Sequence, residues 1–518
     1  MASITLVCLR NNCVLYRICQ NETVVYCFGS GHTEGSVMNA GQGGRIEGVE
    51  LTRRRLLAVG GGLLAAACTT NGSEPTTTAD DTGLRAAVRG RVLLPGDAGF
   101  EQARTPWNLA VDQSVRAVVE LADADDAPAL IRYAREVRRA LTVQPNGHNP
   151  SFAADGTILV RTTRLNEVRI DPATRTARVG VGVNWGQVQA AASQHGLTGV
   201  AGSSPVVGVA GYTLGGGLSW FARRFGWASD SVTAFDIVDA DGRARRVTSS
   251  SDPDLFWALR GGGGDYALVT TLEFTLHPVS ALYGGKMLWP IDRAPRVMAA
   301  FREITATAPD ELTLWFSLLR MDGAPPMVGI DTTYLGDATS GQALLGAFDG
   351  IDGRIVDNRR LMAPAELGSI VGEPTDPSPI RSHAELLNGL TDADVQALLT
   401  TSMNPLGAIQ VRHLGGAIAR SSDSPPGAVT APYYSSFIGG QPTPEAGAAT
   451  ENRIQQYLGA LDRSRGRRTP LTLLNPSQAA IDAFDPGTLH RLRAIKSNVD
   501  PKGLFRSNFP VSAPAAGR

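Results

Sequence analysis

Between residues 112 and 280, the spacing of hydrophobic residues alternates between a strand pattern and a helix pattern. Apolar residues recur on one face of a helix over 126–139, and short apolar runs at 114–121 and 141–144 predict flanking strands. The further predicted elements are hairpins over 168–181 and 235–247, helices that begin after Asn184 and Asp252, and a strand over 266–276. This alternation indicates a first domain over 105–280.

After residue 280 the predicted elements become longer and include strands and helices at 286–289, 297–307, 312–319 and 326–334. Loops rich in proline and serine separate later elements, and the pattern changes again near Pro470. We therefore assign 281–470 to a second domain, an antiparallel sheet with helices. Residues 471–518, with a helix over 489–497, are expected to return to the first domain. The predicted fold class is α+β.

The segment 51–68 has the form of an export signal. Arg53–Arg55 precede twelve apolar residues that end in small side chains at Cys68. Because about 20 apolar residues are needed to span a bilayer, a permanent transmembrane helix is not expected. The arginines resemble a twin-arginine signal, which exports folded proteins. A buried helix with a basic flank is the alternative. The ending also resembles a lipoprotein cleavage site, although Ala65 stands where leucine is usual, so a lipid anchor at Cys68 is left open.

An export signal of this kind normally begins a protein, yet 50 residues precede this one. They show no clear amphipathic period, so we expect 1–50 to be a spurious or disordered extension, with translation beginning at Met38 or near Val49. The residues after Cys68 are rich in Thr, Asp and Ser, and we assign 69–104 to a polar tether.

Charge and cysteine content exclude several classes of protein. The 518 residues contain 48 Lys and Arg against 49 Asp and Glu, which argues against a nucleic-acid partner. All five cysteines lie within the first 68 residues, so the remainder of the chain has no disulfide, cysteine nucleophile or cysteine metal ligand. No metal site is expected.

Three glycine-containing segments are candidates for ligand binding. The loop 143–149 follows a strand and can turn its backbone N–H groups toward an anion such as a pyrophosphate. Six glycines between 202 and 217 let the backbone lie against a large planar ligand, although a tightly packed glycine crossing is the alternative. Their spacing does not fit the dinucleotide fingerprint that opens a helix. The segment 252–264 is an ordinary capped helix with a glycine stop when taken alone.

Taken in order, these segments resemble the FAD-linked oxidases of the vanillyl-alcohol oxidase/PCMH superfamily, in the berberine-bridge-enzyme-like branch. Residues 146–149 match a Gly-Gly-His-Ser loop, 204–212 match Cys-Pro-Thr-Val-Gly-Val-Gly-Gly-His, and 254–264 match Asp-Leu-Phe-Trp-Ala-Leu-Arg-Gly-Gly-Gly-Gly. The resemblance covers 105–511 and implies a PCMH-type FAD-binding domain. The cofactor-binding residues that it implies are Pro145, Asn146, Gly147, His148, Asn149, Ser203, Ser204, Val207, Gly208, Gly211, Tyr212, Gly215, Gly216, Ile237, Asn475 and Asn508.

The sequence also departs from the family. The resemblance implies one covalent bond from His148 to the flavin 8α-methyl group, because Ser204 replaces the second anchor, a cysteine. The family's Tyr-x-Asn-Tyr becomes Leu473-Leu474-Asn475-Pro476, which loses both tyrosines. A catalytic base must then come from elsewhere, and His413 and Tyr434 are our candidates; packing or hydrogen bonding is the alternative role for each.

The resemblance implies an enzyme that oxidises a small alcohol, sugar or amine by hydride transfer to flavin N5, and the segment 51–68 indicates that it is exported. Val209 and Ala210 resemble the small residues that leave oxygen a path to the flavin, which favours oxygen as the electron acceptor. The alternatives are a dehydrogenase that uses another acceptor and a non-catalytic flavin- or ligand-binding lipoprotein. Peroxide formation separates the first two functions, and absence of flavin reduction favours the third.

Overall fold

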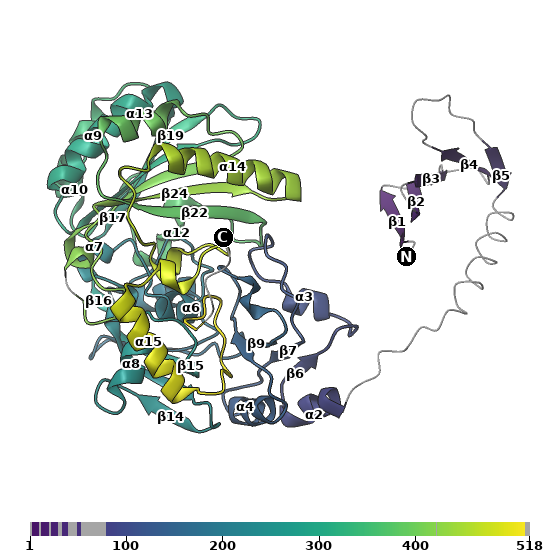
Figure 1. The fold of residues 1–518 in the computed structure, drawn as a ribbon. Coiled ribbons are helices and arrows are strands. Elements are labelled where there is room, and N and C mark those ends of the chain that lie inside the picture. Colours follow the sequence, from purple (N-terminus) through teal and green to yellow (C-terminus); the bar gives the residue numbers. More distant parts are fainter. Residues whose placement is uncertain are drawn as a thin grey trace. The chain divides into compact units, whose positions relative to one another are not determined.

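The computed structural model describes residues 79–420 and 422–512, together with five strands nearer the N-terminus (Figure 1). The chain divides into two units, Met1–Thr77 and Thr78–Arg518. The first unit holds an antiparallel sheet in the order β1-β2-β3-β4-β5. These strands are β1 (Ser3–Leu9), β2 (Asn12–Cys19), β3 (Glu22–Phe28), β4 (Glu34–Asn39) and β5 (Val49–Thr52). The signal motif at 53–68, with Cys68, lies outside the described residues, and the assignment of 1–50 stays a prediction.

The second unit begins with a small mixed sheet in the order β6-β7-β9-β8, in which β9 is parallel to both β7 and β8. Its strands are β6 (Arg91–Leu93), β7 (Ala117–Glu120), β8 (Leu141–Val143) and β9 (Ile158–Arg161). The predicted helix is present as α4 (Asp126–Glu136), and it buries Leu130, Ile131 and Ala134. Both flanking strands that the apolar runs predicted are also present.

The predicted boundary at residue 105 lies too late in the chain. Within 79–104 the structure has α2 (Ala79–Ala87), β6 and α3 (Phe100–Arg104). Leu84, Val92 and Phe100 are all less than 9% exposed. Leu84 and Phe100 each stand between a glycine and a charged residue, and Val92 begins a run of only three apolar residues, so the segment gives no extended periodic pattern. They become core residues because they pack against β7, β9 and α4, which come later in the sequence.

A second, antiparallel sheet has the order β10-β11-β15-β13-β14 and contains both predicted hairpins. Its strands are β10 (Val168–Asp171), β11 (Thr176–Gly180), β13 (Val232–Val238), β14 (Ala244–Val247) and β15 (Leu268–Thr275). The helices α5 (Trp185–Ser193) and α8 (Pro253–Leu259) begin where predicted, because the side chains of Asn184 and Asp252 accept hydrogen bonds from backbone N–H groups. The two sheets share one hydrophobic core.

The third sheet belongs to the second half of the chain and is antiparallel, in the order β20-β17-β19-β18-β23-β24-β22, with β21 also paired to β17. Its strands are β17 (Tyr283–Pro290), β18 (Leu312–Leu319), β19 (Met327–Tyr334), β20 (Val356–Asp357), β21 (Arg360–Leu361), β22 (Ile380–Leu387), β23 (Ala408–His413) and β24 (Tyr433–Gly440). Figure 1 shows helices gathered over one face of this sheet, namely α9 (Ala294–Thr307), α10 (Ala338–Leu344), α13 (Asp392–Thr400) and α14 (Pro444–Ala460). A separate core lies beneath them.

Shorter elements join these layers. They are β12 (Leu197–Thr198), which pairs with β16 (His277–Pro278), and the helices α6 (Val209–Leu214), α7 (Ala222–Phe225), α11 (Gly346–Asp349) and α12 (Gly368–Val371). Among the described residues, no helix is long and apolar enough to cross a membrane.

The C-terminal segment returns to the first sheet, as the sequence predicted. The helix α15 (Pro486–Val499) contacts α8. Beyond it, the Leu141 N–H donates to the carbonyl of Leu504 at 2.7 Å, and the Arg506 N–H donates to the carbonyl of Leu141 at 2.9 Å. The last described residues therefore run beside β8, and in Figure 1 the yellow segment reaches the blue part of the chain. The predicted α+β fold class is confirmed.

Candidate active site

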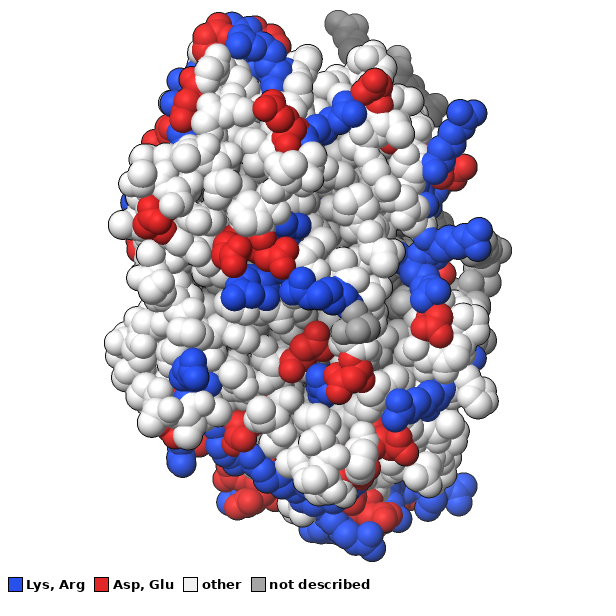
Figure 2. All heavy atoms as spheres, turned by 90° about the vertical axis from the view of Figure 1, so that its left-hand side faces the viewer, with Lys and Arg blue, Asp and Glu red and all other residues white. Residues whose placement is uncertain are grey.

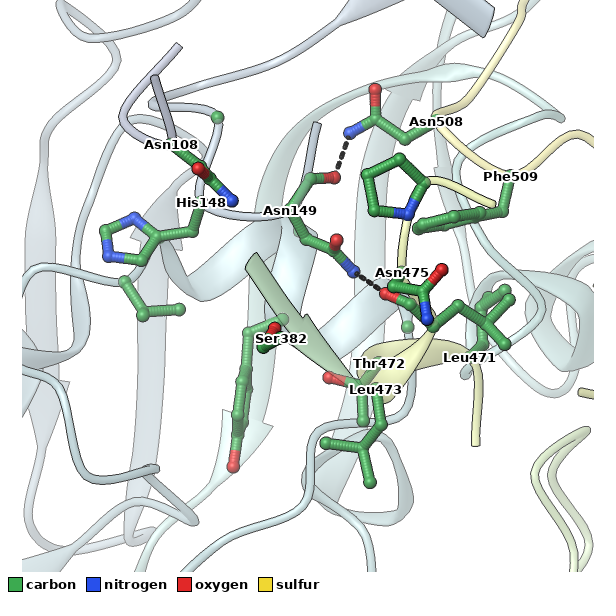
Figure 3. Close-up of a pocket in the computed structure, with 18 of the residues that line it drawn as sticks. Asn108, His148, Asn149, Ser382, Leu471, Thr472, Leu473, Asn475, Asn508 and Phe509 are labelled. Carbon is green, nitrogen blue, oxygen red and sulfur yellow. Dashed lines mark hydrogen bonds between the residues drawn. The ribbon is translucent and has the colours of Figure 1, made fainter. Parts of the chain in front are cut away.

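A cavity of about 600 Å³ opens between the first domain, the third sheet and the C-terminal segment. Three stretches of sequence that are far apart meet around it: the loop 145–149, the glycine segment from 202 to 215, and residues 471–477 with 507–509. The third sheet adds Ser382 and Ala384 from β22, Arg412 from β23 and Tyr434 from β24. Figure 3 shows this wall, with His148 at one side and Asn149, Asn475 and Asn508 grouped at the other.

Most of the predicted site residues line this one cavity. The residues that do so are Pro145, Asn146, Gly147, His148, Asn149, Ser203, Ser204, Val207, Gly208, Gly211, Tyr212, Gly215, Asn475, Asn508 and Tyr434. Gly216, Ile237 and His413 are not part of the lining.

The loop 145–149 is held against its neighbours by close backbone approach. Gly147 has φ +75°, and a Cβ atom there would lie 2.6 Å from the Cβ of Pro106. Only glycine fits such a position without strain. The Asn146 side chain donates from Nδ2 to the carbonyl of Val206 at 2.7 Å, so it joins the loop to the glycine segment. The two segments predicted from sequence therefore form one surface.

His148 stands in an apolar setting within this loop. Its ring stacks on Trp107 with centroids 4.0 Å apart and an interplanar angle of 17°. Neither ring nitrogen has a hydrogen-bond partner, and burial lowers the pKa of His148 to about 4. The imidazole is consequently neutral near pH 7, with a lone pair available for bonding.

The glycine segment is partly helical. After Gly208 the chain forms α6, and a Cβ added at Gly211 would meet open space toward the cavity. Gly216 has a packing role instead: its φ is +103°, and a Cβ there would lie 3.0 Å from Pro426. Ile237 points into the first core from β13. The prediction that Gly216 and Ile237 contact the cofactor through the cavity is therefore not supported.

Several buried polar groups in the cavity wall lack partners. Five of these groups are buried and make no hydrogen bond within the described chain. They are both ring nitrogens of His148 and the hydroxyls of Ser204, Tyr212 and Ser507. Buried polar atoms in proteins are nearly always paired. Their presence around one cavity of about 600 Å³ therefore fits a large ligand with many polar atoms, and FAD is such a ligand.

The asparagines at the other side tie the C-terminal segment to the loop. Asn508 donates from Nδ2 to the carbonyl of Asn149 at 2.8 Å, and Asn149 donates from Nδ2 to the carbonyl of Leu474 at 3.0 Å (Figure 3). The C-terminal return is thus needed to complete the cavity.

The two candidate bases lie on opposite faces of the third sheet. In β23 and β24, Arg412 is paired with Tyr434, and His413 with Tyr433. Because side chains alternate along a strand, only the first pair faces the cavity. His413 is 5% exposed, its Nε2 lies 3.0 Å from Nη1 of Arg223, and burial with that charge lowers its pKa to about 3. The structure thus corrects the assignment of His413 as a catalytic residue.

Tyr434 is held beside a cation that the sequence analysis missed. The guanidinium carbon of Arg412 lies 3.6 Å from the ring centroid of Trp315 and 5.3 Å from that of Tyr434. Burial raises the pKa of Tyr434, although Arg412 acts in the opposite direction. Tyr434 therefore keeps its proton at neutral pH and can donate a hydrogen bond. Arg412 directly precedes His413, so strand alternation was the signal that could have revealed it.

Comparison with known proteins agrees with this geometry. Residues 115–248 match the FAD binding domain family. Over 206 residues the chain is 32% identical to (R)-6-hydroxynicotine oxidase of Paenarthrobacter nicotinovorans, a match that covers 39% of this chain and 45% of that enzyme. The chain thus spans less than half the length of this curated relative.

Similar solved structures cover more of the chain. Berberine bridge enzyme from Eschscholzia californica has a TM-score of 0.73 at 18% identity, covering 84% of this chain and 99% of that chain. Chitooligosaccharide oxidase has a TM-score of 0.74 at 20% identity, covering 85% of this chain and all of the other. At such identities the likeness establishes the fold.

The fold and the cavity define a two-domain FAD-binding protein whose second domain covers the cofactor region with an antiparallel sheet. Residues 115–248 match the FAD binding domain family, and the fold is that of berberine-bridge-enzyme-like proteins, which are among its structural neighbours. The resemblance and the expectation of FAD are confirmed.

Proposed function

We propose that this protein is a FAD-dependent oxidase of a small alcohol, sugar or amine, with oxygen as the electron acceptor. The observation that carries this proposal is the single cavity that joins the loop 145–149 to the third sheet. Relatives named as oxidases of 6-hydroxynicotine and of chitooligosaccharides support an amine or a sugar as the substrate.

The chain's own residues supply binding and orientation. When bound, FAD supplies the two-electron acceptor, which takes a hydride at N5. The loop 145–149, Ser204, Tyr212 and Asn508 would hold the cofactor, since they line the cavity. From the sheet, the protonated Tyr434 would donate a hydrogen bond to a substrate oxygen or nitrogen.

Purified protein that lacks residues 1–68 tests this function. We expect it to be yellow, to carry FAD and not FMN, and to form hydrogen peroxide with one member of a panel of alcohols, sugars and amines. Flavin reduction without peroxide formation would favour a dehydrogenase. A colourless protein that cannot take up added FAD would contradict the proposal, and FAD uptake without reduction by any substrate would favour a binding protein.

We further propose that FAD is attached through one covalent bond to His148. A neutral, unpartnered imidazole at the cavity wall supports this attachment. The bond would join a ring nitrogen to the 8α carbon, and the two hydrogens removed would reduce one oxygen molecule to hydrogen peroxide. After acid precipitation, the flavin should stay with the protein, on the peptide that contains His148. A His148→Ala variant should fold, bind FAD and release it in acid; release from the wild-type protein would exclude the bond.

Export by the folded-protein route is proposed from the sequence alone, with a lipid anchor at Cys68 as the alternative to release. A cofactor-loaded protein cannot be threaded unfolded without losing its ligand. Replacing Arg53 and Arg54 by lysine should leave precursor in the cytoplasm, whereas unchanged export would indicate the general secretory route.

A further inference from the structure

A row of hydrogen bonds leads from the cavity wall into the protein at Asn475. Its Nδ2 atom lies 2.9 Å from Nδ1 of His383, and Nε2 of His383 lies 2.9 Å from Oε1 of Glu385. The same carboxylate oxygen accepts from Nη2 of Arg465 at 2.8 Å. Asn475 lines the cavity, whereas the other three residues stand behind it.

Strand alternation explains this arrangement. His383 and Glu385 are two residues apart on β22 and therefore share a face, while Ser382 and Ala384, which alternate with them, line the cavity. The side chains of His383 and Glu385 are 12% and 7% exposed. Neither side chain lines the cavity. His383 contacts Asn475, and Glu385 contacts His383.

The negative charge on Glu385 sets which atoms donate and which accept in these hydrogen bonds. Burial alone would raise the pKa of Glu385, but hydrogen bonds from His383 and Arg465 outweigh it, so the pKa is lowered. The carboxylate is therefore ionised and accepts a hydrogen bond from the N–H at Nε2 of His383. Nδ1 of that ring is then an acceptor, and Asn475 must present its amide nitrogen to it.

The other half of the amide is also held. Oδ1 of Asn475 accepts from the backbone N–H of Ser477 at 2.9 Å and from its hydroxyl at 2.6 Å. With the oxygen and one N–H engaged, the Asn475 amide has a single orientation, in which one N–H of Nδ2 is left over. Figure 3 shows Asn475 beside Leu471 and Asn149 at the cavity.

We propose that His383 and Glu385 are positioning residues that orient Asn475, so that its remaining N–H donates to an acceptor oxygen of the ligand in the cavity. This inference rests on the proposed function, in which that ligand is FAD or the substrate. Without the hydrogen bond from Asn475 to His383, the amide could rotate. The affinity for the ligand in the cavity should then fall about tenfold, as expected for the loss of one hydrogen bond.

The test uses His383→Phe, His383→Gln, Asn475→Asp and the exposed His490→Phe as a control. Affinity for FAD is measured by titrating deflavinated protein, and KM and kcat are measured with the loaded enzyme. If the bond attaches the flavin too firmly for removal, the titration is made in the His148→Ala background. A weakened affinity for FAD identifies the flavin as the acceptor, and a raised KM alone identifies the substrate.

We expect His383→Phe and Asn475→Asp each to lose about tenfold, with no further loss in the double variant because both act through one amide. Glutamine at 383 can accept from Asn475 and donate to Glu385, so it should restore affinity to within about twofold. Additive losses, or His383→Phe with unchanged affinity and KM, would overturn the inference while the oxidase function stands. If the wild-type protein binds no FAD, both proposals fail.

Discussion

At the scale of single residues, burial decides which histidines can take part in chemistry. His148 and His413 are both neutral near pH 7, because burial lowers the pKa of the first to about 4 and that of the second to about 3. They differ in what their nitrogens meet: those of His148 are unpartnered at the cavity wall, whereas Nε2 of His413 faces Arg223. Only His148 therefore fits the proposed bond to the cofactor.

The low pKa of His413 predicts acid sensitivity. In the unfolded chain the imidazole takes up a proton at its ordinary pKa of 6.5, whereas in the folded protein it does so only near 3. Between these values the unfolded state binds more protons, so the free energy of unfolding falls as pH decreases, by about 1 kcal/mol per pH unit. Urea unfolding from about pH 6.5 to 4.5 should show a shallower pH dependence for His413→Gln than for the wild-type protein.

The exposed His195 is the matched control, and His195→Gln should leave the pH dependence unchanged. Equal slopes for the wild-type protein and His413→Gln would mean that His413 is accessible to protons in the folded state.

At the scale of elements, the alternation of the third sheet assigns neighbouring residues to different tasks. On β24, Tyr434 faces the cavity, while Tyr433 packs in the core beneath the helices, where its hydroxyl lies 2.7 Å from Oγ1 of Thr305 in α9. The sequence motif contains both tyrosines side by side. The sheet register separates the one available to substrate from the one that holds a helix in place.

Two phenylalanine variants make this separation measurable. Tyr434→Phe should lower kcat/KM at least tenfold, because a positioned proton donor is lost, and should leave the thermal midpoint almost unchanged. Tyr433→Phe should do the reverse: it should cost about 1 kcal/mol of unfolding free energy through the lost hydrogen bond to Thr305, with activity within about twofold. Steady-state kinetics and thermal unfolding of both variants measure the two effects. An equal loss of activity in Tyr433→Phe and Tyr434→Phe would contradict the assignment of Tyr434, and not Tyr433, to the substrate side of the sheet.

At the scale of the whole molecule, the cavity depends on the C-terminal return. A buried lysine anchors that return: Nζ of Lys496 lies 2.6 Å from Oδ2 of Asp500 and 2.7 Å from the carbonyl of Phe505. It also donates to the carbonyl of Asp265, whose carboxylate accepts from the N–H groups of Ser507 and Val511. The face in Figure 2 carries Lys and Arg interspersed with Asp and Glu, whereas Lys496 is only 6% exposed.

Lys496→Met should therefore disturb stability and cofactor binding together. Loss of the cation leaves Asp500 buried without its charged partner, which typically costs about 3–5 kcal/mol. Because Ser507 and Asn508 follow directly and line the cavity, affinity for FAD should also fall. Urea unfolding and FAD titration measure the two effects, with the exposed Lys502→Met as the control. A destabilised variant with unchanged affinity for FAD would show that the cavity forms without this anchor.

The sequence by itself determined the fold class, the glycine-containing loop 145–149 and the starts of the predicted helices α5 and α8, because these depend on local signals. Asn184 and Asp252 cap their helices from side chains next to the helix start, and the loop with Gly147 needs a backbone that only glycine allows. The order of the motifs was enough to predict an FAD-binding domain, which the family match over residues 115–248 supports.

Only the tertiary structure decided which residues share the cavity. Strand register turned Arg412 and Tyr434 toward it and His413 away, and a one-residue offset on a strand reverses a side chain. In the row from Asn475 to Arg465, Asn475 pairs with His383, 92 positions away, and Arg465 pairs with Glu385, 80 positions away. The predicted tether extended too far, to residue 104, because the short apolar stretches within 79–104 become part of a core only when strands from later in the chain cover them.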